Sequence, residues 1–452
     1  MLREKMLAVM SEVNEQVAER TELVCYIAIA LLAQKNLFIL GSTGQAKSYV
    51  VDLFRERIQG TKQFKYTLSK GTDEEQLFGR LDLGSLIPGG IPAAVLEKDP
   101  SYQNLYQDAR VSHQSYEYVP NEKNYQAFLE AASRLEKYRQ ALGQSGQGRP
   151  SIITKGKIPE SHIIWLDEVF KANDGLLNAL LTALNEREYT NEGTTIKIPA
   201  ISFFAASNEI PNFSDPAESI LRPLYDRFEL KVITQYVQDR DTRLAMLTKK
   251  QKGTPAAYCS TINLEELRKM QQQVKLVKVP AAINEVMDDI LCALRRKGIH
   301  VSDRKYFGFT PIVQALAWLE GRTEVQVSDL LGLGAYLWST PEELAQINQI
   351  LKNVCENPMK ERLDNLRTMA LESWDAFEQD RDAVGVKAIR KFREDMLTIY
   401  QQFTAIQNEA RTDADSRSLE ELLSFLEEKN RSASGAVGFT YVPLPEMAQL
   451  PN

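Results

Sequence analysis

The chain has 452 residues, of which 43% are hydrophobic and 25% are charged, so it is long enough for two or three domains with ordinary globular cores. Its formal net charge of −7 argues mildly against a surface that binds nucleic acid without sequence preference, although it does not exclude a local basic channel. The four cysteines form no C-x-x-C pair and the three histidines lie far apart, which argues against a zinc or iron site.

The apolar stretches near the N-terminus do not have the features that membrane insertion or secretion needs. LVCYIAIALLA (23–33) is too short to span a bilayer. The segment MLREKMLAVMSEVNEQ contains acids and has no small-residue cleavage site, so we expect no signal peptide. Scattered thiols fit a reducing compartment, and we therefore expect a cytoplasmic protein with no membrane span.

The first predicted elements are two helices, a strand and a third helix. An amphipathic helix at 2–18 is followed, after ERT, by a buried helix at 22–34. The apolar NLFIL (36–40) is typical of a buried strand, and SYVVDLFRERI (48–58) of a helix. Between them lies a loop with two glycines, GSTGQAK. Strand, glycine-bearing loop and helix in this order are the context that a phosphate-binding loop requires.

This loop has the residue types that hold a nucleoside triphosphate. In such loops backbone N–H groups point at phosphate oxygens, a lysine neutralises the outer phosphates and a hydroxyl binds Mg²⁺. Ala46 stands where the usual pattern has its second glycine. Because it lies where the helix begins, we expect it to adopt helical torsions and to leave the loop open. The alternative is a glycine turn with a solvated lysine. The predicted nucleotide-binding residues are Gly41, Ser42, Thr43, Gly44, Gln45, Ala46, Lys47 and Ser48.

A long segment rich in tyrosine follows a predicted strand at 62–69 and a short capped helix at 72–79. It occupies about 85–157, has helical patches such as 124–142, and is interrupted by glycine-rich stretches. Tyrosine supplies contact area with a polar tip, as at protein interfaces. The segment is either a partner-facing extension or an elaboration that packs on its own domain. Stacking on single-stranded nucleic acid is less favoured, because dense Lys and Arg are missing. The tyrosines are Tyr102, Tyr106, Tyr116, Tyr118, Tyr125 and Tyr138.

A second motif lies at the end of another predicted strand. HIIWLDE (162–168) is typical of a buried strand of a parallel sheet and ends in Asp167 and Glu168. The first acid can hold Mg²⁺ through water and the second can polarise an attacking water, although the pair could also cap a helix. Two such motifs at strand ends of one α/β domain favour a nucleotide site.

The remaining pattern predicts the layers of the fold. An amphipathic helix at 174–188, a hairpin at 189–199 that turns at 191–193, and a buried strand at 200–208 follow the acids. Strands that alternate with helices indicate a three-layer α/β sandwich. From about 235 onward the strand signal nearly vanishes, and 361–403 has the spacing of a long helical hairpin or coiled segment.

These elements in this order resemble the AAA+ ATPases. The run IIWLDEVFKANDGLLNALLTALNEREYTNEGTTIKIPAISFFAASNEIPN (163–212) is similar to the MoxR family, and within it to the RavA-like branch, in which loops ending in A-K-S or A-K-T are usual. The resemblance covers about 15–84 and 150–340. It implies an α/β fold of the AAA+ type, in which a three-layer αβα P-loop domain with a parallel sheet precedes an all-α lid domain and a C-terminal helical segment.

The resemblance also divides the chain. It implies an AAA+ nucleotide-binding domain at 1–235, in which the segment at about 85–157 takes the place of the family's helix-2 insert. A helical lid at 236–340 follows, and then a C-terminal helical hairpin or coiled segment with a flexible tail at 341–452. RavA-like proteins often carry an extra domain with β-structure in this last region, which the helical pattern here does not match.

The site residues that the resemblance implies bind ATP and Mg²⁺. Ser48 and Asp167 would hold the metal, and Glu168, Asn208 and Arg227 would be catalytic. Asn208, which closes FFAASN, matches the first sensor, a polar residue that helps to position the attacking water. The hairpin at 186–199 corresponds to the family's pre-sensor hairpin.

Two arginines would act from outside the loop and the acids. Arg227 in LYDRF matches the arginine finger, which reaches the γ-phosphate of a neighbouring subunit, with Arg222 as the alternative. Arg304 in VSDRKYFGF matches the second sensor and would contact nucleotide in its own subunit, with Lys305 as its competitor. A finger supplied by a neighbour makes sense only in a ring, and the family forms hexamers.

The function that the resemblance implies is a ring-forming ATPase that remodels or activates a protein partner. The family commonly acts with proteins that contain von Willebrand factor A domains, so we expect such a partner. An alternative is a motor that acts on nucleic acid or in anti-phage defence. A third possibility is a nucleotide-gated scaffold that hydrolyses ATP very slowly.

Overall fold

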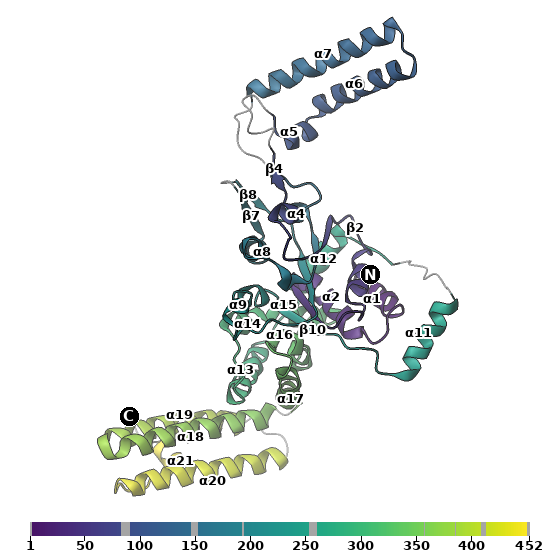
Figure 1. The fold of residues 1–452 in the computed structure, drawn as a ribbon. Helices are drawn as coiled ribbons and strands as arrows, with labels where there is room; N and C mark the ends of the chain where they lie inside the picture. The colour runs from purple at the N-terminus through teal and green to yellow at the C-terminus, as the bar shows by residue number, and fades with distance from the viewer. Residues whose placement is uncertain are drawn as a thin grey trace. The chain divides into compact units, whose positions relative to one another are not determined.

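The computed structural model describes residues 2–82, 91–145, 152–191, 194–252, 260–356, 358–384, 386–407 and 413–449. The chain forms two compact units, Met1–Arg268 and Lys269–Asn452. Their helices and strands are labelled in Figure 1. The finer domain boundaries at 235 and 340 stay predictions.

The first unit is built on a sheet of five parallel strands in the order β10–β1–β9–β6–β3. These are β1 (Leu37–Leu40), β3 (Gln63–Thr67), β6 (Ile163–Asp167), β9 (Ser202–Ser207) and β10 (Leu230–Ile233). Every residue of β9 is buried, as expected of a strand whose sheet is covered by helices on both faces. Because the strands are parallel, their carboxyl ends meet at one edge of the sheet.

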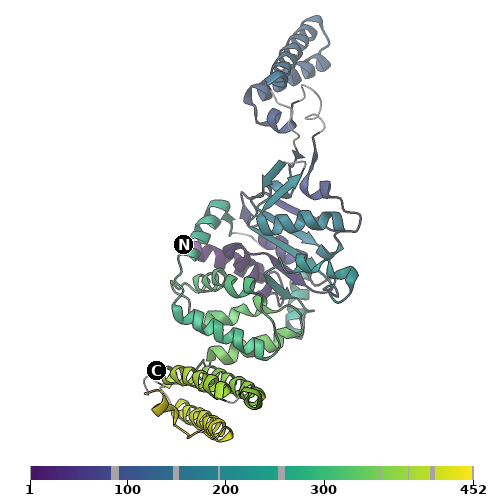
Figure 2. The same cartoon turned by 90° about the vertical axis from the view of Figure 1, so that its left-hand side faces the viewer.

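Helices cover both faces of this sheet (Figure 2). They are α1 (Leu2–Asn14), α2 (Thr21–Ala33), α3 (Lys47–Arg55) and α8 (Asp174–Glu186). Phe38, Ile164 and Phe203 face the side where the leucines of α8 complete a buried cluster. The alternate residues, such as Ile39 and Trp165, are buried on the other side, where α1, α2 and α3 pack together and α2 packs on β1 and β10. The predicted three-layer α/β fold is confirmed.

The predicted elements of this unit are present, with shifted ends. The first helix ends at Asn14 rather than near 18. The helix predicted at 174–188 ends at Glu186, because Arg187 takes left-handed torsions (φ 56°). The predicted hairpin is formed by β7 (Glu188–Asn191) and β8 (Thr194–Lys197), and its turn residues 192–193 lie outside the described residues.

Further helices and short strands complete the first unit. They are β2 (Ile58–Gln59), α4 (Glu74–Phe78), β4 (Arg80–Leu81), α5 (Ala93–Lys98), α6 (Pro100–Tyr118), α7 (Glu122–Ser145), β5 (Ile152–Ile153), the 3₁₀ turns η2 (Ile158–Glu160) and η3 (Val169–Lys171), α9 (Pro216–Ser219), α10 (Arg222–Tyr225), α11 (Arg240–Lys252) and β11 (Ile262–Asn263). The helix α12 (Leu264–Lys275) crosses the boundary between the units.

The tyrosine-rich segment forms a long helical hairpin. Its helices α6 and α7 lie side by side in both views (Figures 1 and 2). Asp99 accepts a hydrogen bond from the Tyr102 N–H at the start of α6, and the Tyr138 hydroxyl of α7 donates to the same carboxylate at 3.1 Å. The Tyr116 and Tyr125 rings pack across the pair near its far end. The segment therefore has a defined helical structure over 93–145, although its glycine-rich stretches at 83–90 and 146–151 lie outside the described residues.

The described residues of the second unit form helices joined by loops, and their only β pairing is an isolated bridge between Lys278 and Glu324. It contains α13 (Ala281–Arg296), α14 (Asp303–Gly308), α15 (Thr310–Leu319), the 3₁₀ stretch η4 (Val327–Leu333), α16 (Gly334–Leu337), α17 (Glu343–Glu356), α18 (Pro358–Val384), α19 (Val386–Gln407), α20 (Asp413–Ala436) and α21 (Leu444–Met447). The hairpin predicted at 361–403 is the α18–α19 pair, to which α20 adds a third long helix with a shared apolar core (Figure 2). Within the described ranges, no helix of either unit is long and apolar enough to cross a bilayer.

Candidate nucleotide-binding site

The predicted loop and acids lie at one edge of the central sheet. The loop leaves the carboxyl end of β1, Asp167 ends β6, and Asn208 follows β9, which lies between them. The register places Leu40 beside Ser207 and Leu166 beside Ala205, so the three chain ends leave the sheet at the same level. This edge, with a helix N-terminus following the loop, is where parallel α/β sheets bind ligands.

Side chains from all three chain ends form one contact network. The Lys47 ammonium donates to the Gly41 carbonyl, to the Ser42 carbonyl at 3.2 Å and to Asn208 Oδ1 at 2.9 Å. Asn208 Nδ2 donates to Glu168 Oε1 at 2.7 Å. The structure thus brings together the loop lysine, the second acid and the polar residue after β9, although Lys47 and Asn208 are 161 positions apart in the sequence.

A second contact joins the loop hydroxyl to the first acid. The Ser48 hydroxyl donates to Asp167 Oδ2 at 3.2 Å. Hydroxyl and carboxylate oxygens are the ligands that Mg²⁺ prefers, so the donor set fits this ion. Glu168 also pairs with Lys171 at 3.3 Å. Its left-handed backbone (φ 54°) is one that non-glycine residues rarely adopt, as is found at functional sites.

Burial of Lys47 disfavours the charged form of its side chain. The side chain is only 7% exposed, and burial lowers the pKa of its ammonium below the ordinary value, while the carboxylates of Asp167 and Glu168 partly offset this effect. An anion that entered the loop would favour the charged form further. The position of Lys47 therefore suits a lysine whose charge is balanced by a bound phosphate.

The torsions of Ala46 differ from the prediction. Helical torsions were expected, but Ala46 is the N-cap of α3 with φ 60° and ψ 22°, which is the left-handed conformation that glycine adopts without strain. The position therefore has the backbone shape that the usual glycine provides, in an L residue.

The two glycines and Gln45 have distinct roles in the loop. A Cβ on Gly41 would lie 2.0 Å from Thr234 Oγ1, so that position has no room for a side chain. Gly44 has a φ of 83° in open space. Gln45 was predicted to contact nucleotide, but its side chain is buried and accepts a hydrogen bond from the Thr234 hydroxyl at 2.9 Å, so that only its backbone can face a ligand. Ser42 and Thr43 are exposed.

Arg20 was not predicted as a site residue from the sequence. This buried arginine, just before α2, donates from Nε and Nη2 to the Gln45 carbonyl at 3.3 and 3.2 Å, and from Nη2 to the Gln235 carbonyl at 2.6 Å. The segment ERT was interpreted only as a helix boundary. Nothing in its local pattern signals a contact with a loop 25 positions away.

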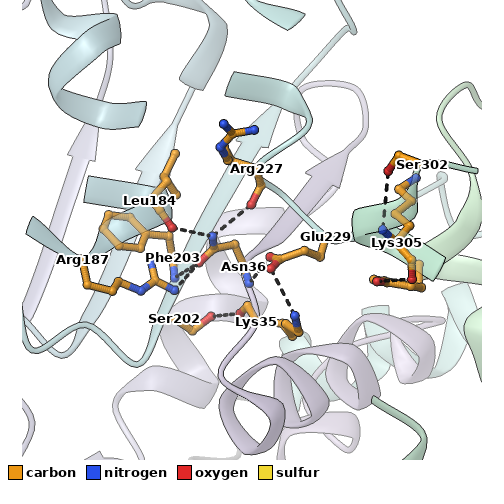
Figure 3. Close-up of polar contacts among 11 residues, drawn as sticks. Lys35, Asn36, Leu184, Arg187, Ser202, Phe203, Arg227, Glu229, Ser302 and Lys305 are labelled. Atoms are coloured by element: carbon orange, nitrogen blue, oxygen red, sulfur yellow. Dashed lines mark hydrogen bonds and ion pairs between the residues drawn. The ribbon is translucent and has the colours of Figure 1, made fainter. Parts of the chain in front are cut away.

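Arg227 lies at the opposite end of the sheet from the loop. It precedes β10, which pairs in parallel with β1 through Leu37 and Leu230, and Asn36 Nδ2 donates to the Arg227 carbonyl at 3.0 Å. A strand of four residues spans about 13 Å, so Arg227 is separated by a strand length from the phosphate loop of its own subunit. In Figure 3 its guanidinium points away from the Asn36 cluster. The alternative, Arg222, is exposed at the start of α10.

The second-sensor candidates lie in the second unit, on α14. Lys305 is already engaged: its ammonium donates to the Leu337 and Trp338 carbonyls, both at 3.0 Å. Figure 3 shows its backbone N–H bonded to Ser302. Arg304 is exposed. Lys305 is thus held by contacts within the second unit, and the role of Arg304 stays a prediction.

Family models match most of the first unit and part of the second. A sequence model described as "MoxR domain in the MoxR-vWA-beta-propeller ternary systems" matches residues 4–102 and 141–272. A model described as an AAA lid domain matches residues 283–351. Residues 103–140, most of the α6–α7 hairpin, lie between the matched segments.

Similar proteins and structures were also found. Two uncharacterized proteins of Methanocaldococcus jannaschii, MJ0079 and MJ0812, are each 26% identical to this chain, and the matches cover 80% and 75% of it and 77% and 72% of those proteins. Structural protein ORF618 of Acidianus two-tailed virus is 20% identical, over 71% of this chain and 47% of that protein. The solved structure of a "putative ATPase" from Cytophaga hutchinsonii has a TM-score of 0.51 at 15% identity, covers 78% of this chain and 94% of that one, and shows the fold alone.

Proposed function

This chain belongs to the MoxR family of AAA+ ATPases, and from that premise we propose that it is a RavA-like, ring-forming enzyme that binds and hydrolyses ATP with Mg²⁺. The work of hydrolysis would be the remodelling or activation of a protein partner. The observation that carries the proposal is the contact network at one edge of the sheet, in which Lys47 bonds to Asn208 and Asn208 to Glu168. Beside these contacts, Ser48 bonds to Asp167.

Each side chain of the network would act on a different part of the reaction. Lys47 neutralises the outer phosphates, and Ser48 with Asp167 holds the metal. Mg²⁺ bound there supplies positive charge that stabilises the phosphate oxygens during transfer. Glu168 accepts the proton of the attacking water, and the Asn208 amide orients that water.

Nucleotide binding would exchange contacts that the loop makes with itself. Lys47 now donates to two loop carbonyls and to Asn208. A phosphate that takes the lysine also frees Asn208 Oδ1, while Asn208 Nδ2 holds Glu168. Asn208 therefore links the presence of a phosphate to the position of the proposed base.

The position of Arg227 supports a ring. A guanidinium one strand length from its own phosphate loop is placed to serve another subunit, as an arginine finger does. We propose a hexamer, in which each site is completed by its neighbour. Hydrolysis would then report on subunit contact.

The partner is proposed from the name of the matched family model, which mentions von Willebrand factor A and β-propeller components. We propose a cytoplasmic partner that contains a von Willebrand factor A domain. A partner of this kind should raise turnover, and DNA should not. Turnover raised by DNA with a steep salt dependence would favour the nucleic-acid motor instead.

Glu168→Gln tests the reaction. The amide cannot accept the proton, so we expect ATP affinity to be retained while single-turnover hydrolysis falls about a hundredfold or more. Glu209→Gln, which changes an exposed acid beside Asn208, is the matched control and should keep the wild-type rate. If Glu168→Gln hydrolysed ATP like the wild type, the chain would be a nucleotide-gated scaffold or use another base.

A further inference from the structure

We propose that Arg20 is a positioning residue of the phosphate loop, which holds the Gln45–Ala46 peptide so that an alanine can do what a glycine usually does there. The inference rests on the proposed function of the loop as a nucleotide site. It adds a residue outside the loop, the acids and the sensors, and explains how the loop keeps its shape with Ala46.

The contacts of the Arg20 guanidinium are with backbone carbonyls at and around the phosphate loop. Its side chain is 7% exposed, and its guanidinium donates to three backbone carbonyls: Glu19 at 2.8 Å, Gln45 at 3.2 Å and Gln235 at 2.6 Å. The planar fork of five donors allows a guanidinium to hold carbonyls in several directions at once. It thereby joins the start of α2, the loop and the segment after β10.

Holding the Gln45 carbonyl also fixes the next N–H group. A trans peptide is planar, and its C=O and N–H point in opposite directions. The Gln45 carbonyl points at Arg20 through two hydrogen bonds, so the Ala46 N–H points away from Arg20. In phosphate-binding loops the N–H groups just before the lysine are donors to phosphate oxygens. Arg20 therefore orients a donor without touching the ligand.

Ala46 is the reason that the loop needs the contact between Arg20 and the Gln45 carbonyl. With φ at 60°, Ala46 lies in a conformation that is unfavourable for an L residue by about five- to thirty-fold in population, and glycine does not pay this penalty. A free loop would relax Ala46 to negative φ and turn its N–H. The Thr234 hydroxyl donates to Gln45 Oε1 and so restrains the Gln45 side chain, but it does not restrain the Gln45 carbonyl.

The test is a double-mutant cycle on nucleotide affinity in the full chain, read by calorimetric titration with ADP and with ATPγS in Mg²⁺ buffer. We expect Arg20→Gln to weaken binding about tenfold or more. Ala46→Gly alone should stay within about threefold of the wild type. In Arg20→Gln/Ala46→Gly the loss should shrink by about five-fold or more, because glycine needs no help to adopt the left-handed conformation.

Two further variants separate the proposed role of Arg20 from a general loss of folding. Arg20→Lys keeps the charge without the fork and should give a smaller loss that Ala46→Gly also rescues, which serves if Arg20→Gln does not fold. Arg57 is another arginine of the first unit with 3% exposure, and Arg57→Gln should lower the thermal midpoint without a selective loss of nucleotide affinity.

Two outcomes would overturn the inference. One is an equal loss from Arg20→Gln in the wild-type chain and in the Ala46→Gly background, and the other is an equal loss from Arg57→Gln. A wild-type chain that bound neither nucleotide would overturn the proposed function together with it.

Discussion

Two cations, the buried Lys47 and the partly buried Arg187, lie at opposite ends of the central sheet. Lys47 faces the loop at the carboxyl edge. At the other end, Arg187 donates to Asn36 Oδ1 at 2.8 Å and lies over the Phe203 ring at 4.8 Å, and burial lowers its pKa to about 10. Arg187 is thus held in place by contacts of the fold, whereas Lys47 is held by contacts that a phosphate can replace.

We expect His162, just before β6, to make the first unit sensitive to acid. Its Nδ1 accepts a hydrogen bond from the Lys62 N–H, and burial, with the charges of Arg268 and Lys62, lowers its pKa. Between this lowered pKa and the unfolded value of about 6.5, the unfolded chain binds more protons, so stability falls as pH falls below about 6.5.

We therefore expect His162→Gln to reduce the drop in thermal midpoint between about pH 7.5 and pH 5.5, because glutamine can accept the bond but does not titrate in this range. The measurement is a pair of melting curves at each pH for the variant and the wild type. Identical drops would show that His162 does not contribute to the acid sensitivity.

The residues that sequence reasoning could identify are those whose chemistry is local. Lys47 and Ser48 follow a strand within a motif, and Asp167 and Glu168 end another, so pattern and parallel topology together predicted their meeting. Arg20 was missed because it acts through single contacts with carbonyls 25 and 215 positions away. The left-handed torsions of Ala46 were not predicted either, and we propose that they depend on the same contacts.

At the scale of elements, Asn36 joins four parts of the first unit (Figure 3). Its buried side chain accepts from Arg187 Nη2 and from the Phe203 N–H, and donates to the carbonyls of Leu184 and Arg227. It thereby ties the end of α8, the base of the β7–β8 hairpin, the start of β9 and the proposed finger to the start of β1.

Asn36→Ala should destabilise the first unit by about 2–4 kcal/mol, because it leaves the partly buried Arg187 and several backbone groups with fewer partners. Asn178→Ala, at an exposed position of α8, should change stability by less than about 0.5 kcal/mol. Urea unfolding followed by intrinsic fluorescence measures both. A loss for Asn36→Ala no larger than for Asn178→Ala would contradict the junction.

In the α6–α7 hairpin, sequence periodicity predicted the helices but not how they pair. The sequence predicted helical patches in this segment, and the structure confirms them, but their pairing through Tyr116, Tyr125 and Tyr138 was not predicted. The sequence left open whether the tyrosines face a partner or pack on their own domain, and Tyr116 and Tyr138 make contacts within the hairpin. Tyr118, at the end of α6, is 89% exposed and therefore still fits the partner-facing interpretation.

Replacing 103–140 by a short glycine–serine linker separates the two interpretations of this hairpin. Because the segment lies outside the matched family model, we expect ADP affinity and basal hydrolysis to stay within about twofold of the full chain, and partner-stimulated turnover to be lost. Melting curves and steady-state ATPase assays provide the readouts. A lower thermal midpoint with stimulation retained would favour packing on its own domain instead.

At the scale of the whole molecule, the fold class followed from the alternation of strands and helices, and the loss of strand signal after 235 correctly indicated a helical second half. The structure of a single chain does not show how subunits assemble. The proposed catalytic groups are divided between a site with Glu168 and an arginine at the far end of the sheet, so the complete centre would need two subunits.

Mixing two inactive variants tests this division directly. Glu168→Gln subunits keep the finger and lack the base, and Arg227→Ala subunits keep the base and lack the finger, so neither should hydrolyse ATP alone. In an equal mixture that exchanges subunits, about a quarter of the interfaces would pair an intact site with an intact finger, and hydrolysis should recover to roughly that fraction of the wild-type rate. Activity of the mixture no greater than the sum of the separate variants, with exchange verified, would contradict a site completed by the neighbouring subunit.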